Sequence, residues 1–315
     1  MVFYLGIDGG GTKTRCALGN ETAVLATAVS GGSNIVRFGE VLAEGHGLDS
    51  RARESLHAVV NQACTMAKIP PNQIQAICLG AAGAARPEAA AKLRSVLAEL
   101  NPHAEIQVVG DNVIALEAAF SSGPGVIAIA GTGSVVYGRD ASGHTARAGG
   151  WGFAISDEGS GQWIGRHAVS AVMRARDHGR ETALTDVILD AWKLVDLDAL
   201  IQHANSTPPP EFPRLFPLVI HAADEGDVTA RDLLVQAGTE LAGLAATVIR
   251  RLAPAPPHVP VAMTGSVFRQ SAEVRRIFYN RLETTFPGIK VRNDFVDPVV
   301  GALALARAAA RSTTA

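Results

Sequence analysis

The sequence predicts an α/β protein of two domains, each built on a sheet that contains parallel strands. Short apolar runs typical of buried strands alternate with helical patterns along much of the 315 residues. A strand, a glycine turn and a second strand also occur twice, over residues 2–18 and 125–138. The length suggests two domains, and an apolar content of 47% is enough for a large core.

In the first part of the chain, the two strands around the first glycine turn are followed by a third strand over residues 23–29. Pro70 and Pro71 end a long helix, and Pro87 opens another, where its missing N–H is harmless. The elements expected up to residue 120 are a helix over 40–68, a strand over 74–79, a helix over 87–100, a strand over 106–109 and a helix that follows residues 110–112.

Helical patterns dominate the second part of the chain. We expect strands over 125–130, 135–138, 260–264 and 289–292, and helices over 162–177, 181–194, 197–203, 213–225, 227–252, 271–286 and 299–310. If the last helix returns to the first domain, that domain is discontinuous. The expected domains are then residues 1–115 with about 297–315, and residues 116–296.

Composition narrows the possible partners and compartments. The 28 basic and 30 acidic residues give a net charge of −2, so charge does not favour a nucleic-acid or membrane partner. Cys16, Cys64 and Cys78 have no paired spacing, which argues against a disulfide framework, a zinc site or a cysteine-ligated cluster. No signal peptide or membrane span is evident, and we expect a cytoplasmic protein.

The first glycine turn is a candidate phosphate site. Its residues are Asp8, Gly9, Gly10, Gly11 and Thr12, followed by Lys13. Consecutive glycines let backbone N–H groups converge on an anion, and a carboxylate at the strand end can hold Mg²⁺ against it. The sequence lacks the lysine of a Walker motif and the third glycine of a dinucleotide fingerprint. An ordinary hairpin turn is the structural alternative.

The second glycine turn consists of Gly131, Thr132, Gly133 and Ser134. It repeats the architecture of the first turn, although the two copies share little sequence identity. Two such hairpins facing one another could hold a polyphosphate from both sides.

The order of these and four further motifs resembles that of N-acetylglucosamine kinases. The motifs are Asp8-Gly9-Gly10-Gly11-Thr12, Gly110-Asp111, Ala130-Gly131-Thr132-Gly133-Ser134, Gly149-Gly150-Trp151-Gly152, Asp157-Glu158-Gly159-Ser160 and Thr264-Gly265-Ser266. The chain is similar, almost from end to end, to that family and to the wider BadF/BadG/BcrA/BcrD-type ATPases of the actin-like sugar-kinase superfamily. Each motif alone is weak, whereas six in order are specific.

The resemblance implies two actin-like, ribonuclease H-like domains with an ATP and sugar cleft between them, and a homodimer. It implies transfer of the γ-phosphoryl group of ATP, with Mg²⁺, to a hydroxyl of an amino sugar, expected to be O6 of N-acetylglucosamine. The implied sugar site comprises Asn34, Asp111, Gly149, Gly150, Trp151 and Asp157, and the implied adenosine turn is Gly265 and Ser266. The family pattern has glycine where this chain has Ala222, whose methyl group would narrow the base pocket.

Three of the implied side chains have structural alternatives. Asp111 is the candidate catalytic base, but an aspartate before an apolar helix is also a good N-cap. Asp157 could accept a hydrogen bond from a sugar hydroxyl, or complement the dipole of the helix that follows it. Trp151 could offer a flat wall to a sugar ring or an acetyl methyl group, or simply fill the core.

Other functions remain open. Some relatives are ATP-driven activators of dehydratases or reductases, whose metal cluster is held by cysteines that this chain does not match. The ROK sugar kinases carry a zinc-binding cysteine run that is absent here. A non-catalytic sugar-binding protein is disfavoured by Asp111. Glucosamine, N-acetylmuramic acid and N-acetylmannosamine are alternative substrates.

Overall fold

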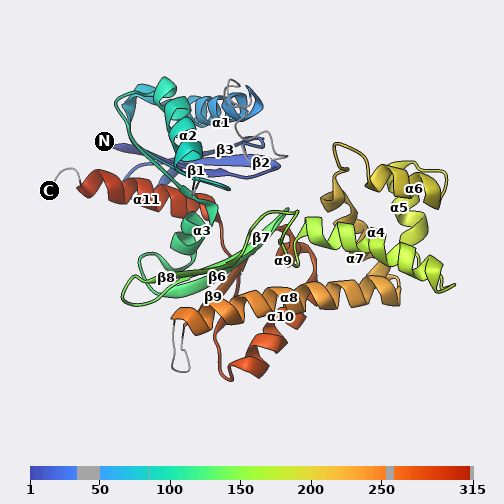
Figure 1. The fold of residues 1–315 in the computed structure, drawn as a ribbon. Helices are drawn as coiled ribbons and strands as arrows, with labels where there is room; N and C mark the ends of the chain where they lie inside the picture. Colours follow the sequence, from blue (N-terminus) through green and yellow to red (C-terminus); the bar gives the residue numbers. More distant parts are fainter. Residues whose placement is uncertain (34–49, 85, 253–258, 313–315) are drawn as a thin grey trace. The chain divides into compact units, whose positions relative to one another are not determined.

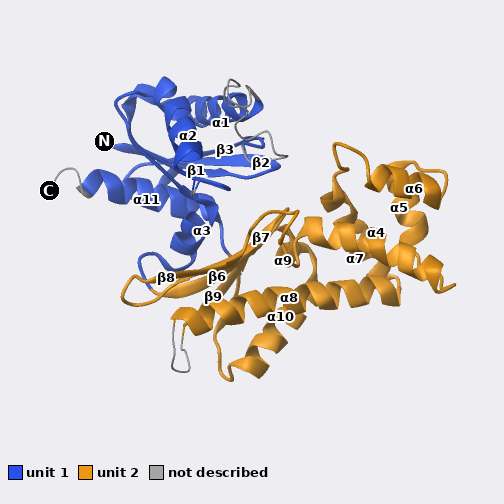
Figure 2. Cartoon of the chain, viewed as in Figure 1, with its two compact units in different colours: residues 1–123, 296–315 blue, residues 124–295 orange. Residues whose placement is uncertain are grey.

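The computed structural model describes residues 1–33, 50–84, 86–252 and 259–312 (Figure 1). The chain forms two compact units (Figure 2). Unit 1 comprises Met1–Gly123 and Val296–Ala315, and unit 2 comprises Pro124–Phe295. The expected boundary after residue 115 lies within helix α3 (Asp111–Phe120), whose buried residues keep the whole helix in unit 1.

Unit 1 contains a five-stranded sheet with the strand order β3-β2-β1-β4-β5. Its strands are β1 (Phe3–Gly9), β2 (Lys13–Gly19), β3 (Val24–Gly31), β4 (Ile74–Ala81) and β5 (Glu105–Gly110). The first three strands are antiparallel neighbours, whereas β4 runs parallel to both β1 and β5. The carboxyl ends of β1, β4 and β5 therefore lie at the same edge of the sheet.

Helices cover both faces of this sheet (Figure 1). On one face lie α1 (Ser50–Ala67) and α2 (Pro87–Leu100), and a short 3₁₀ helix, η2 (Pro71–Gln73), follows α1. On the other face lie α3 and the last helix, α11 (Pro298–Ser312). Successive side chains of β1 point to opposite faces of the sheet, so each face has its own apolar core. Leu5 and Ile7 face α1 and α2, whereas Tyr4 faces α11.

Unit 2 contains a second five-stranded sheet, with the strand order β10-β9-β6-β7-β8. Its strands are β6 (Gly125–Ala130), β7 (Ser134–Arg139), β8 (Thr145–Gly149), β9 (Val261–Thr264) and β10 (Val291–Phe295). The sequence did not predict β8. Its residues form a strand because they pair with β7 over the whole of Thr145 to Gly149.

The remaining elements of unit 2 are helical. They are α4 (Gly161–Asp177), α5 (Leu184–Trp192), α6 (Leu197–Ala204), the 3₁₀ helix η3 (Phe212–Leu215), α7 (Phe216–Asp224), α8 (Val228–Leu252), α9 (Ser266–Gln270) and α10 (Ala272–Thr285). Within the described part of the chain, α8 is long and apolar enough to cross a membrane by length and composition. Its buried residues instead belong to the core of unit 2, where it packs against α7, α10 and β7.

One helix was missed by the sequence prediction, and another can be compared only in part. The single helix expected over 271–286 is preceded by α9, which begins at Ser266 because Gly265 adopts a φ of +105° and starts the helix directly after β9. The helix expected over 40–68 is described only from Ser50 onward, as α1, and its first ten expected residues lie outside the described part of the chain.

Candidate functional site

Asp8 lies near the end of β1, directly opposite Arg15 of β2 in the antiparallel register. Burial, and after it the nearby carboxylate of Asp111, raise the pKa of the Asp8 carboxyl to about 6. Asp297 acts in the same direction, whereas the positive charge of Arg15 opposes the shift. Asp8 is therefore a carboxylate held where negative charge is costly.

Asp111 lies at the same edge of the sheet as Asp8. Strand β5 ends at Gly110, and Asp111 is the first residue of α3. The N-cap position belongs to Gly110, so the predicted alternative of an aspartate N-cap is wrong. The Asp111 Oδ1 atom instead accepts a hydrogen bond of 2.9 Å from the backbone N–H of Asn112. This bond orients the carboxylate and leaves it within electrostatic range of Asp8.

The first glycine turn is a tight turn that packs against the end of β3. The N–H of Gly10 donates to the carbonyl of Lys13 at 3.1 Å, so this amide closes the turn. A Cβ atom on Gly9 would come within 2.8 Å of the Ser33 hydroxyl oxygen. The buried Ser33 is held in turn by a hydrogen bond of 2.8 Å between its hydroxyl and that of Thr14. The turn is thus fixed in shape by its neighbours.

The carboxylates at and near Asp8 fit a magnesium ion that the phosphates of a nucleotide also coordinate. Within the described residues, no three His, Cys, Asp or Glu side chains are grouped closely enough to hold a metal ion. Mg²⁺ in kinases is held by one or two carboxylates, several waters and the phosphates of the nucleotide. A partly buried Asp8 with the carboxylate of Asp111 nearby supplies that kind of incomplete, negatively charged site.

The second glycine turn, in unit 2, is fastened to the start of α4. The N–H groups of Gly161 and Gln162 donate to the carbonyls of Gly131 and Thr132 at 2.8 and 3.1 Å. The hydroxyl of Ser134 donates to the carbonyl of Glu158 at 2.7 Å. These bonds hold the turn rigidly at the end of β6, which is the edge where phosphate turns of α/β sheets are found.

Asp157 lies against this same turn. It is a nonglycine residue with a φ of +68°, and it is 9% exposed. Its Oδ1 atom accepts a hydrogen bond of 3.4 Å from the N–H of Ser134, and a Cβ atom on Gly133 would lie 3.1 Å from its Oδ2 atom. The structure therefore places this predicted sugar ligand beside a predicted phosphate turn.

The predicted adenosine turn contacts the end of β6, directly before the second glycine turn. Gly265 lies so close to the end of β6 that a Cβ atom on it would be 2.1 Å from the carbonyl oxygen of Ala130. Ser266 follows as the first residue of α9. The parallel pairing of β6 with β9 brings the two turns together at one edge of the sheet.

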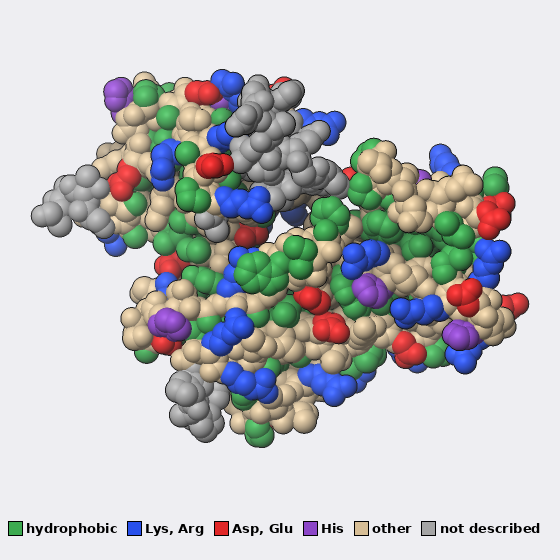
Figure 3. Space-filling view, in the orientation of Figure 1, with side chains coloured by type: hydrophobic (Ala, Val, Ile, Leu, Met, Phe, Trp, Pro, Cys, Tyr) green, Lys and Arg blue, Asp and Glu red, His purple; other side chains and the backbone are tan. Residues whose placement is uncertain are grey.

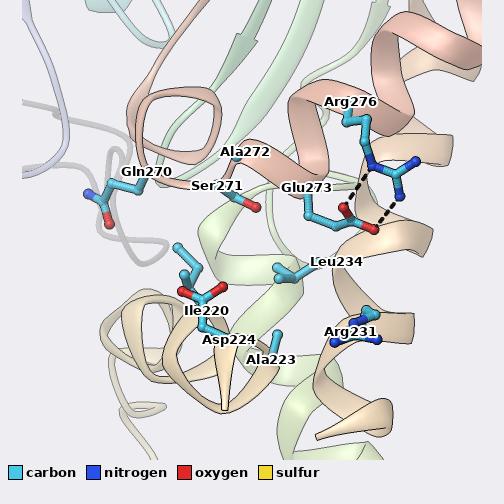
Figure 4. A pocket seen from close by; sticks show the side chains of 10 residues that line it. All are labelled: Ile220, Ala223, Asp224, Arg231, Leu234, Gln270, Ser271, Ala272, Glu273 and Arg276. Carbon is cyan, nitrogen blue, oxygen red and sulfur yellow. Dashed lines mark hydrogen bonds and ion pairs between the residues drawn. The ribbon is translucent and has the colours of Figure 1, made fainter. Parts of the chain in front are cut away.

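A cavity of about 500 Å³ lies beyond the C-terminal end of α9 (Figure 4). It is lined by Ile220, Ala223 and Asp224 of α7, Arg231 and Leu234 of α8, and Gln270, Ser271, Ala272, Glu273 and Arg276. Glu273 and Arg276 form an ion pair of 2.6 Å on its wall, which lowers the pKa of Glu273. Ala222 does not line the cavity, because its side chain is buried in the core of unit 2.

The segment after β8 presents apolar side chains on the surface of unit 2. Gly149, Gly150 and Gly152 all have positive φ angles, and the indole of Trp151 is 63% exposed. The alternative prediction, that Trp151 fills the core, is therefore wrong: its side chain is not part of the core of unit 2. The guanidinium of Arg147 lies 4.6 Å from the centre of the indole ring and fixes its orientation.

The sequence analysis missed Arg15 and Asp297. Arg15 donates two hydrogen bonds to the Asp297 carboxylate, of 2.6 and 2.8 Å. Only the pairing of β1 with β2 and the return of α11 bring these residues near Asp8, so no local pattern could identify them. The predicted sugar ligand Asn34 lies outside the described residues.

Comparison with known proteins identifies the family. The model of the BadF/BadG/BcrA/BcrD ATPase family matches residues 5–306. The chain belongs to this family. A protein named N-acetylmuramic acid/N-acetylglucosamine kinase from Clostridium acetobutylicum is 31% identical, over 98% of this chain and 99% of its own length. An N-acetyl-D-glucosamine kinase from Dictyostelium discoideum is 30% identical, over 96% of this chain and 97% of its own.

A solved structure extends this similarity to the fold. A protein from Chromobacterium violaceum, described as an N-acetylglucosamine kinase, superposes with a TM-score of 0.76 and 28% sequence identity. The match covers 97% of this chain and 99% of that protein. This ATPase-family chain therefore has the two-domain, actin-like α/β fold expected from its motifs.

Proposed function

We propose that the protein is an ATP-dependent amino-sugar kinase that transfers the γ-phosphoryl group to O6 of N-acetylglucosamine. The observation that carries this proposal is the placement of Asp111 beside Asp8 at one edge of the unit 1 sheet. A candidate base thus lies next to a candidate metal carboxylate, as phosphoryl transfer to a hydroxyl requires. The names of the similar kinases from Clostridium acetobutylicum and Dictyostelium discoideum support the same activity.

Asp111 serves as the general base in this proposal. Its carboxylate accepts the proton of the sugar hydroxyl as the bond from that oxygen to the γ-phosphorus forms. The bond between the γ-phosphorus and the β–γ bridging oxygen breaks at the same time, and ADP leaves. The hydrogen bond from the Asn112 N–H holds the carboxylate in one orientation. Asp8 would hold Mg²⁺ directly or through water, and the ion would supply positive charge that offsets the charge of the nucleotide phosphates.

Unit 2 contains further residues that bind the nucleotide in this proposal. Gly131, Thr132, Gly133 and Ser134 form a rigid turn that holds phosphates through its backbone. Gly265 packs against the end of β6 beside that turn. The cavity beyond α9 receives the base of the nucleotide, because α9 is a single short helix of five residues between the Gly265 turn and the cavity.

The environment of Asp157 favours an N-acetylated sugar over a free amine. A free amine needs a carboxylate partner, but the Asp157 carboxylate packs against Gly133 and accepts from the Ser134 N–H. An acetyl methyl group needs an apolar surface, and the exposed, oriented indole of Trp151 provides one.

An activator of a dehydratase is the second candidate function. Such a protein needs cysteines that can reach a metal cluster, whereas Cys16, Cys64 and Cys78 are all buried in the cores of unit 1. Burial also raises the pKa of the Cys64 thiol to about 11, so this side chain is a poor metal ligand. A colourless purified protein supports the kinase; a brown, iron-containing protein supports the activator.

The proposal places the enzyme in the cytoplasm as a homodimer, following the family resemblance. Charged side chains of both signs are interspersed over the face shown in Figure 3, and the net charge is −2. These features favour a small-molecule substrate over a nucleic acid.

The test is a coupled ADP-release assay with N-acetylglucosamine, glucosamine, N-acetylmuramic acid and N-acetylmannosamine. We expect the highest kcat/KM with N-acetylglucosamine, and ³¹P and ¹H NMR of the product should locate the phosphate on O6. ATP hydrolysis without phosphorylation of any of these sugars would exclude the proposed activity.

A further inference from the structure

The N-terminal end of α11 is tied to the unit 1 sheet by one ion pair. Arg15 of β2 and Asp297, which directly precedes α11, are 282 positions apart in sequence. The two guanidinium nitrogens of Arg15 donate to both oxygens of the Asp297 carboxylate, at 2.6 and 2.8 Å. This bidentate geometry fixes the orientation as well as the distance of the carboxylate.

The body of α11 is held independently of that ion pair. A Cβ atom on Gly6 of β1 would lie 2.2 Å from the backbone nitrogen of Leu303. A Cβ atom on Gly301 would lie 2.0 Å from the carbonyl oxygen of Ile114. Because these close backbone contacts set the path of the helix, loss of the ion pair would leave α11 in place. The Asp297 carboxylate would then keep the long hydrogen bond of 3.4 Å that its Oδ1 atom accepts from the Val299 N–H, and would lose the two short bonds from Arg15.

Arg15 faces two carboxylates but binds one of them. It lies opposite Asp8 in the register of β1 and β2, and its charge acts on Asp8. Its hydrogen bonds nevertheless go to Asp297. The Arg15 and Asp297 side chains are 27% and 37% exposed, so the released carboxylate would have room to move.

We propose that Arg15 is a positioning residue that keeps the Asp297 carboxylate out of the magnesium site beside Asp8. The proposal rests on the kinase function proposed above. In a kinase, Mg²⁺ must retain coordination positions for the phosphates of the nucleotide and for water. An additional carboxylate would bind the ion before the nucleotide arrives and would suit Mn²⁺ or Ca²⁺ as well. The ion pair thereby limits the number of protein carboxylates that can coordinate the metal ion.

The test measures metal binding without any turnover. Mn²⁺ is titrated into nucleotide-free protein, and free Mn²⁺ is measured by electron paramagnetic resonance. We expect R15M to bind Mn²⁺ about 10-fold more tightly than the wild type, and the double variant R15M/D297N to return to wild-type affinity. R15K should lie between R15M and the wild type, because an ammonium group cannot form the bidentate pair.

A matched control is R53M, which removes another arginine–carboxylate pair of unit 1, Arg53 with Glu99 at 2.6 Å. This pair joins α1 and α2, on the face of the sheet away from α11, so R53M should leave Mn²⁺ affinity unchanged. Kinetic assays add a second measurement: R15M should lose activity at high Mg²⁺ concentrations that the wild type tolerates.

Two outcomes would overturn the inference: wild-type Mn²⁺ affinity in folded R15M, or tighter binding that persists in R15M/D297N. If R15M does not fold, R15K provides the same comparison, and equal Mn²⁺ affinities of folded R15K and the wild type would count against the role of Arg15. Because Mn²⁺ binding requires no sugar, a shift in R15M together with inactivity on every amino sugar would reject the kinase function and retain the role of Arg15.

Discussion

Asp8→Asn should stabilise the nucleotide-free protein while it abolishes the proposed activity. Burial and the nearby Asp111 and Asp297 carboxylates raise the pKa of Asp8 from 3.8 to about 6. A shift of roughly two units, at 1.36 kcal/mol each, means that the ionised form costs the folded state about 3 kcal/mol. An amide of the same shape carries no charge and removes this cost.

The pH dependence of this difference follows from proton binding. Between pH 3.8 and about 6 the folded state holds a proton on Asp8 that the unfolded state has released. The Asp8 contribution to the free energy of unfolding is therefore complete below pH 3.8 and is lost as the pH rises through 6. The variant and the wild type should be equally stable near pH 4, and the variant should be more stable by up to about 3 kcal/mol at pH 8.

Urea denaturation of both proteins at pH 4.5, 6 and 8, with EDTA present, measures this difference. Mg²⁺ with ATP should then stabilise the wild type more than the variant, because only the wild type offers the ion a carboxylate at position 8. Asp8→Asn could instead be less stable than the wild type at pH 8, or the difference in stability could be independent of pH. Either result would show that the ionised Asp8 carboxylate does not destabilise the folded protein.

Three further variants address the remaining parts of the site. Asp111→Asn should lower kcat by about 10²-fold or more with an unchanged circular dichroism spectrum; near-normal turnover would remove Asp111 as the base. Gly265→Ala should destabilise the protein by about 2 kcal/mol more than Gly143→Ala, because both glycines have positive φ but only the Cβ at Gly265 would meet Ala130. Equal urea midpoints would contradict this steric argument. Trp151→Ala should raise KM for N-acetylglucosamine about 10-fold and leave KM for ATP unchanged; an unchanged sugar KM would exclude the stacking role.

Local sequence patterns predicted the elements that carry strong local signals. The strands that flank the glycine turns are short apolar runs bounded by glycine, and each adopts the expected extended structure. Pro87 marks the first turn of α2 as expected. The short helix α9 was missed because a five-residue helix has too few residues for a periodic pattern. Its start depends on the close approach of Gly265 to β6, which is a tertiary contact.

The candidate site was predictable where its residues belong to motifs. Asp8 lies near the end of β1 and Asp111 directly follows β5, and parallel pairing of β1 with β4 and of β4 with β5 brings them to one edge of the sheet. Arg15 and Asp297 belong to no motif, and their pairing depends on the return of α11. The position of Asp157 depends on the left-handed conformation of its own backbone, which is uncommon for aspartate.

The return of α11 to unit 1 also bears on how the protein is made on the ribosome. The face of the first sheet that includes Tyr4, Ala17 and Cys78 packs against α11, which is the last helix synthesised. At about 5–20 residues per second, synthesis of the intervening unit takes roughly 10–30 s. During that interval this apolar face lacks its covering helix, and Asp297 has not yet met Arg15. A nascent chain that stops before α11 therefore exposes an apolar surface to chaperones and proteases and lacks the Arg15–Asp297 ion pair.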